Sequence, residues 1–84
     1  MAYEIIVKPS AQRDLDSLPA REVGRIAFRI AHLANEPRPV GVLKLTNAEG
    51  YRIRSGYYRI LYEIDDIKQR VLIYRIKHRK DVYR

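Results

Sequence analysis

The chain has 84 residues and a formal net charge of +7, from 17 lysines and arginines against 10 acidic residues. This length accommodates one small domain, residues 1–84, with a modest hydrophobic core. There is no cysteine, which excludes disulfides and cysteine-ligated metal sites, and no apolar stretch long enough to span a membrane. The N-terminus lacks the pattern of a secretory signal, so we expect a cytoplasmic protein.

The first half of the chain predicts one strand followed by two helices. Residues 3–7 are rich in β-branched and aromatic side chains, as is typical of a strand. Pro9 fits the first turn of a helix, and Pro19 ends that helix. A second helix ends near Asn35, because two prolines follow it closely. The apolar face of the first helix consists of Ala11, Leu15 and Leu18. That of the second consists of Val23, Ile26, Ala27, Ile30, Leu33 and Ala34.

The middle of the chain predicts a loop followed by a β-hairpin. Residues 36–50 form the loop, in which we expect Leu43 and Leu45 to reach the core and Lys44 to face outward. Residues 51–64 alternate in hydrophobicity on either side of a Ser-Gly turn, which is typical of two antiparallel strands.

The last predicted strand spans residues 71–77 and follows a polar turn. Strict alternation would direct Leu72, Tyr74 and Ile76 toward the core. The predicted order is β-α-α-β-β-β, and the short turns require antiparallel pairing among the last three strands. We therefore predict an α+β domain in which two N-terminal helices pack on one face of a mainly antiparallel four-stranded sheet.

The hairpin separates its arginines from most of its hydrophobic side chains. Alternation places Arg52, Arg54 and Arg59 together on one face, opposite an apolar face. Residues 51–84 hold ten lysines and arginines against four acidic residues, whereas residues 1–50 hold seven against six. Clustered arginines favour phosphate binding, and the uneven charge favours a nucleic acid or an acidic protein as partner.

The sequence offers little for metal or nucleophilic catalysis. His32 and His78 are far apart, and Asp65-Asp66 falls in a turn, so we expect no metal and no cofactor. Arginines and the C-terminal Tyr83 would suffice for cleavage of RNA by its own 2′-hydroxyl, in which the protein orients the hydroxyl and neutralises the phosphate. Neighbouring cations would favour the phenolate form of Tyr83, which could then act as a base. Its ring could instead stack on a nucleobase. The alternative to both roles is that Tyr83 packs on the edge of the sheet.

The segment YRIRSGYYRILYEI, followed by a strand and KHRKDVY, resembles the RelE/ParE superfamily of bacterial toxin–antitoxin systems. The likeness covers nearly the whole chain. The C-terminal HR-x-x-VY element is more specific to the RelE-type mRNA interferases. The resemblance implies a toxin that cuts mRNA in the A site of the ribosome and that forms a hetero-oligomer with a cognate antitoxin protein.

The resemblance also implies roles for five residues. Arg52 and Arg54 fall where the family places basic residues beside the scissile phosphate, and Arg59 falls on its phosphate-stabilising arginine. Arg79 falls on the C-terminal arginine that assists the leaving group or the phosphate. Tyr83 falls on the tyrosine that stacks on, or activates, the nucleotide.

The general base is not evident from the sequence, because arginine stays protonated and is a poor proton shuttle. His78 is our candidate, with an exposed tail histidine as the alternative. Further RNA contacts are expected from Lys44, Arg75, Lys77, His78 and Lys80. Two other interpretations stay open: a ParE-like toxin that inhibits DNA gyrase by protein binding, and an inactive member that binds only nucleic acid or antitoxin.

Overall fold

A computed structural model of the chain describes residues 2–45 and 50–81. The elements in chain order are β1 (Glu4–Val7), α1 (Pro9–Asp16), α2 (Ala20–Leu33), β2 (Leu43–Lys44), β3 (Tyr51–Ser55), β4 (Tyr58–Asp65) and β5 (Arg70–His78). Both predicted helices and all four predicted strands are present, and β2 lies within the segment predicted as a loop. Across the described part of the chain, no helix has the length and apolar character needed to cross a membrane.

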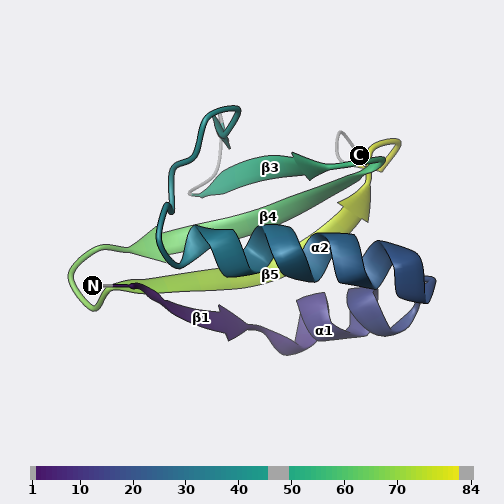
Figure 1. The fold of residues 1–84 in the computed structure, drawn as a ribbon, viewed down its shortest axis with the longest axis horizontal. Coiled ribbons are helices and arrows are strands. Elements are labelled where there is room, and N and C mark those ends of the chain that lie inside the picture. The colour runs from purple at the N-terminus through teal and green to yellow at the C-terminus, as the bar shows by residue number, and fades with distance from the viewer. Residues whose placement is uncertain (1, 46–49, 82–84) are drawn as a thin grey trace.

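The described strands form one five-stranded sheet in the order β1-β5-β4-β3-β2. β1 pairs parallel with β5, and the other neighbouring strands pair antiparallel. The α+β class is confirmed, and the mixed sheet has one strand more than predicted. α2 runs across one face of the sheet, α1 lies beside β5, and the end of β5 reaches the β3–β4 turn (Figure 1).

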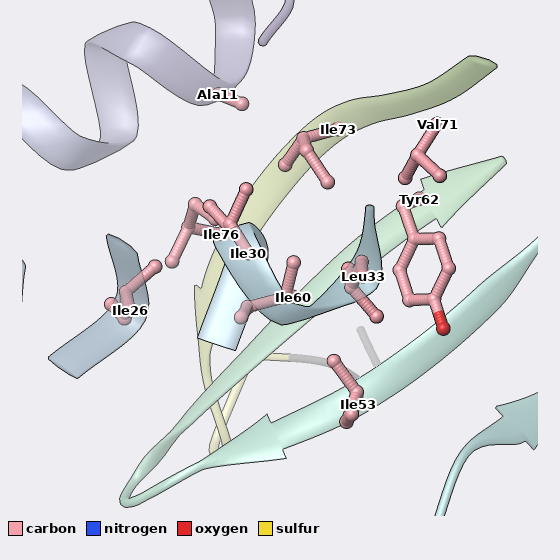
Figure 2. Packing of buried hydrophobic residues seen from close by; sticks show 10 residues of the cluster. All are labelled: Ala11, Ile26, Ile30, Leu33, Ile53, Ile60, Tyr62, Val71, Ile73 and Ile76. Atoms are coloured by element: carbon pink, nitrogen blue, oxygen red, sulfur yellow. The ribbon is translucent and has the colours of Figure 1, made fainter. Parts of the chain in front are cut away.

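The core lies between the helices and one face of the sheet, where buried side chains of both layers point toward one another (Figure 2). Burial of one aliphatic side chain of this size stabilises the fold by about 1.5–3 kcal/mol. The buried cluster consists of Ala11, Ile26, Ile30, Leu33, Ile53, Ile60, Tyr62, Val71, Ile73 and Ile76.

The prediction that Leu43 reaches the core is wrong, since its side chain is 54% exposed. Leu43 pairs with Arg52, whereas Lys44 pairs with Tyr51, so the alternation of β2 is shifted by one residue from the predicted one. Val42 packs against the core in place of Leu43. Leu45 is only partly buried.

A β-bulge in β5 decides which side chains of the last strand face the core. Leu61 of β4 pairs with Arg75, but the next residue, Tyr62, pairs with Ile73. Tyr74 is therefore an extra residue that has no direct partner in the register. An extra residue in one strand of a pair changes which side chains of that strand face the core on the far side of the bulge.

Because of the bulge, the side chains at the start of β5 face the opposite way to the prediction. Val71 and Ile73 are fully buried, so the prediction that Leu72 and Tyr74 face the core is wrong. Ile76, on the far side of the bulge, is buried as predicted. The bulge thus allows both halves of β5 to place their aliphatic residues inside while the basic residues stay on the other face.

α1 covers the edge of β5 that β1 leaves open, because β1 pairs only with residues 70–73. Beyond that point the Ser10 hydroxyl donates a hydrogen bond of 2.6 Å to the Tyr74 carbonyl. The Asp14 carboxylate accepts one of 2.8 Å from the backbone N–H of Ile76. These contacts satisfy edge groups that would otherwise offer a site for another strand.

Candidate nucleic-acid interface

A row of three cations crosses the sheet near the β3–β4 turn, on the face away from the helices. Arg54 of β3 pairs with Arg59 of β4, and Arg59 pairs with Lys77 of β5. Paired residues project from the same face, and the neighbouring Ile53–Ile60 pair is buried on the other one. We call Arg54, Arg59 and Lys77 the basic row. Like charges directly opposite each other destabilise a sheet, so the basic row favours an anionic partner.

The backbone of the β3–β4 turn orients both arginines of the basic row. Arg54 Nε and Arg59 Nη1 each donate a long hydrogen bond of 3.3 Å to the carbonyl oxygen of Gly56. Arg59 Nη1 also donates to the Tyr58 carbonyl at 3.1 Å. Gly56 has a φ of +60°, a conformation that favours glycine and that this tight turn requires. The turn thus brings two guanidinium groups together before any ligand binds.

A second row, formed by Arg52, Leu61 and Arg75, lies next to the basic row on the same face. The predicted gathering of three hairpin arginines on one face is therefore confirmed. Arg75 is also tied to α1, because its Nε lies 2.9 Å from Asp14 Oδ2. Asp14 raises the pKa of Arg75 above its ordinary value by a hydrogen bond and by charge attraction. A structural ion pair thus competes with the RNA contact that we expect from Arg75.

Arg79 extends this charged surface to the end of the sheet. Its backbone N–H donates a hydrogen bond of 2.7 Å to the Tyr57 carbonyl, one residue beyond the Tyr58–His78 pair. Neither residue belongs to a strand, and the Tyr57 ring also stacks on the His78 ring, so Tyr57 lies at the end of the sheet beside both Arg79 and His78. The guanidinium carbon of Arg79 lies 5.3 Å from the centre of the Tyr57 ring. We call the basic row together with Arg52 and Arg79 the basic face.

His78 is not part of the basic face, because it pairs with Tyr58, whose side of the sheet carries the helices. The two rings lie edge to face, with centres 5.4 Å apart. His78 Nδ1 accepts a hydrogen bond of 3.2 Å from the backbone N–H of Lys80. This contact engages Nδ1 of His78. A role of His78 as the base stays a prediction.

Two other predicted residues lie outside the basic row, and a third is not described. Lys44 is exposed, but it pairs with Tyr51 and so projects from the opposite face to Arg52. Lys80 is exposed in the turn after β5. Tyr83 lies outside the described residues.

The other end of the sheet carries charges of both signs, with Lys68 and Arg70 beside Asp65 and Asp66. Asp66, in the β4–β5 turn, accepts two hydrogen bonds from Arg38, of 2.8 and 3.2 Å, and one of 2.8 Å from the Tyr3 hydroxyl. These contacts lower the pKa of Asp66 below its ordinary value. Glu63 and Asp65 lie at the same end of β4. The excess positive charge of the sheet therefore lies near the β3–β4 turn, and an extended polyanion would be attracted there.

The basic face can bind a phosphate group and stabilise charge that builds on its oxygens. It is less suited to proton transfer, because arginine stays protonated in proteins. No group of three or more His, Cys, Asp or Glu side chains that could hold a metal ion occurs in residues 2–45 and 50–81. The arrangement therefore fits a reaction in which the substrate supplies the nucleophile and the protein supplies positive charge.

Comparison with known proteins bears on this interpretation. Residues 5–83 match the family described as ParE toxin of the type II toxin–antitoxin system. Toxin RelG of Mycobacterium tuberculosis is 40% identical over 86 residues, which cover 100% of this chain and 99% of that protein. Toxin RelE of the same organism is 34% identical over 84 residues, covering 98% and 87%.

A solved structure gives the same result. In the toxin–antitoxin complex RelBE2 from Mycobacterium tuberculosis, one chain matches with a TM-score of 0.83 and 33% identity. The match covers 93% of this chain and 99% of that one.

Two helices on one face of a mixed sheet and arginines on the other define a toxin of a type II toxin–antitoxin system. The chain belongs to the RelE/ParE superfamily, and its relatives place it on the RelE side. The resemblance seen in the hairpin and the C-terminal segment is thereby confirmed.

The sequence interpretation missed two residues of the interface. Asp14, which binds Arg75 from α1, lies 61 residues away along the chain, and no local pattern links them. Tyr57 contacts Arg79 at the hairpin turn. Alternation groups Tyr57 with Arg59, but the sequence interpretation gave Tyr57 no role in the site.

Proposed function

We propose that this protein is a metal-independent endoribonuclease that cleaves mRNA in the ribosomal A site and so inhibits translation in the cytoplasm. The observation that carries the proposal is the basic row, in which Arg54, Arg59 and Lys77 lie side by side on the face without helices. A folded domain has no need of three adjacent cations in a sheet. Binding of a phosphodiester would offset their mutual repulsion.

In the proposed reaction the 2′-oxygen of the RNA attacks the adjacent phosphorus and the bond to the 5′-oxygen breaks. The products are a 2′,3′-cyclic phosphate and a 5′-hydroxyl, because the proton lost by the 2′-hydroxyl is balanced by one gained at the leaving oxygen. Arg54 and Arg59 stabilise the charge on the non-bridging oxygens, and Arg79 that on the leaving oxygen. Proton transfer falls to Tyr83, since arginine cannot serve as a base.

We further propose that an antitoxin protein binds this chain and covers the basic face. The structure of the RelBE2 relative is that of a toxin–antitoxin complex. An acidic segment would neutralise the charge of the basic face, as RNA would. Antitoxin and RNA should therefore exclude each other.

The test is primer extension on mRNA bound to programmed ribosomes, beside a naked-RNA control. A new stop in the A-site codon that requires both ribosomes and protein would support the proposal. Cleavage of naked RNA at the same rate would support the proposed reaction but show that it does not require the ribosome. Folded, antitoxin-free protein that cuts neither substrate would refute the proposal.

One observation favours a second candidate, because the matching family is named for ParE and parDE. A ParE-like protein would inhibit DNA gyrase by binding to it rather than by cutting RNA. Supercoiling by purified gyrase, measured with and without this protein, separates the two. Inhibition of gyrase without cleavage on ribosomes would replace the first proposal with the second.

A further inference from the structure

Tyr57 is a large aromatic residue in the tight turn between β3 and β4, and 62% of its surface is exposed. A single exposed aromatic residue is common and indicates nothing by itself. Phe28 on α2 is equally exposed, at 64%, and lies on the side of the sheet that carries the helices. What distinguishes Tyr57 is its place beside the basic row.

Three contacts hold Tyr57 at the edge of the basic face. Its carbonyl accepts the 2.7 Å hydrogen bond from the N–H of Arg79, which fixes the backbone. The Arg79 guanidinium carbon lies 5.3 Å from the centre of the Tyr57 ring. The His78 ring lies nearly parallel to the Tyr57 ring, at 13°, with centres 6.2 Å apart. The ring is thus ordered by its neighbours and still exposed over most of its surface.

The surroundings of Tyr57 combine the two features that single-stranded RNA requires of a protein. Positive charge follows the phosphates, and an aromatic face accepts a base. Arg79, whose guanidinium lies over the Tyr57 ring, and Arg59, two residues further along the chain, supply the charge near Tyr57. An RNA strand whose phosphate lies on the basic row would have a base within reach of the turn.

We propose that the Tyr57 ring stacks on a nucleobase next to the phosphate bound by the basic row, and so binds the substrate rather than taking part in proton transfer. This inference rests on the proposed RNA cleavage and adds a binding residue to it. Stacking is tolerant of base identity, because every base offers a π-face. Tyr57 should therefore contribute to affinity at this position with little base preference.

The test compares Tyr57→Ala, Tyr57→Phe and Tyr57→Trp in the cleavage assay on programmed ribosomes, with Phe28→Ala as the matched control. Loss of one base–aromatic stack should raise KM about tenfold for Tyr57→Ala with kcat nearly unchanged. Tyr57→Phe and Tyr57→Trp should restore the wild-type KM, because both retain an aromatic face. Phe28→Ala should match wild type.

A second measurement monitors the stack directly. An mRNA with 2-aminopurine in the A-site codon and a 2′-O-methyl group at the cleavage position binds without being cut. Wild type, Tyr57→Phe and Tyr57→Trp should quench its fluorescence, and Tyr57→Ala should not.

The outcomes separate this inference from the function on which it rests. Wild-type protein that fails to cut any substrate would refute the proposed function. Wild-type protein that cuts, with Tyr57→Ala equal to it in KM and in quenching, would refute the stacking role alone. A Tyr57→Phe variant as impaired as Tyr57→Ala would also refute it, because the hydroxyl rather than the ring would then be responsible.

Discussion

Arg54 and Arg59 donate hydrogen bonds to the same acceptor, the carbonyl oxygen of Gly56, from opposite strands of one hairpin. Two guanidinium groups repel each other in this arrangement, and the carbonyls of the turn hold them in place. The hairpin therefore orders a site for an anion before the anion arrives. Binding loses less conformational freedom when the groups are already in place.

The first prediction concerns Arg59. Arg59→Ala should reduce kcat for mRNA cleavage by about 100-fold or more, the effect of removing one preorganised donor from a developing negative charge. Arg59→Lys should be intermediate, because lysine keeps the charge but lacks the planar fork. The free energy of unfolding should change by less than about 1 kcal/mol, because relief of the like-charge pair opposes the loss of the hydrogen bonds to the turn. Single-turnover cleavage and urea denaturation measure both quantities. Full-rate cleavage by Arg59→Ala would show that the site has been misassigned.

The second prediction compares two lysines on opposite faces of the sheet. Lys77→Ala removes a cation of the basic row and should weaken binding to programmed ribosomes. Lys44→Ala should leave cleavage close to wild type, because Lys44 shares a face with Tyr51 rather than with Arg52. Cleavage rates at several salt concentrations would measure the difference, since a lost phosphate contact lowers the salt dependence. An equal loss in both variants would contradict the assignment of RNA to one face.

The faces of the hairpin could be predicted from the sequence, but those of the neighbouring strands could not. In residues 51–64 arginines alternate with apolar residues, so the inward face is marked. Residues 71–74 are all apolar, and this run gives no sign of which side faces inward. In residues 42–45 the Leu-Lys-Leu alternation predicts Leu43 inside, but Leu43 lies exposed on the edge strand β2. A bulge at Tyr74 depends on the register with β4, which no local pattern encodes.

The third prediction tests the bulge. Deletion of Tyr74 removes the extra residue, so one half of β5 must turn its inner side chains outward. Exposure of Val71 and Ile73 alone would cost about 3–6 kcal/mol, a large part of the stability of a small domain. Urea denaturation followed by circular dichroism measures this loss. Tyr74→Thr, which keeps the residue count, should cost much less. Equal midpoints for the deletion and wild type would show that the bulge is not required.

The candidate site was partly predictable in the same way. The arginines of one strand pair could be placed together because alternation is a local rule. The side of the sheet that His78 occupies also follows from the alternation around Ile76, but its ring contacts with Tyr57 and Tyr58 depend on the folded hairpin. The ion pair between Asp14 and Arg75 connects a helix to a strand, and it could not be predicted because it depends on how the two elements pack.

The fourth prediction concerns the ion pair between Asp14 and Arg75. Asp14→Ala removes the ion pair with Arg75 and leaves the N–H of Ile76 without its acceptor, so it should lower the free energy of unfolding by about 2 kcal/mol. Asp14→Asn keeps an acceptor oxygen for that N–H and should cost about 0.5–1 kcal/mol, as expected for a partly exposed ion pair. Asp16→Ala, which loses only an exposed contact with Gln12, is the control. Urea denaturation ranks the three. The assignment fails if Asp14→Ala is no worse than the control.

The fifth prediction uses the contacts of Asp66 with Arg38 and Tyr3 at the β4–β5 turn. The folded state lowers the pKa of Asp66, so these contacts contribute stability at pH values above its unfolded pKa of about 3.9. The contribution is lost as the pH falls through that value toward the lower folded pKa. Asp66→Asn should therefore melt below wild type at pH 6, and the gap should close near pH 3. Thermal unfolding across this range, with Asp16→Asn as the control, measures the gap. A gap that stays constant down to pH 3 would mean that the carboxylate charge of Asp66 does not stabilise this turn.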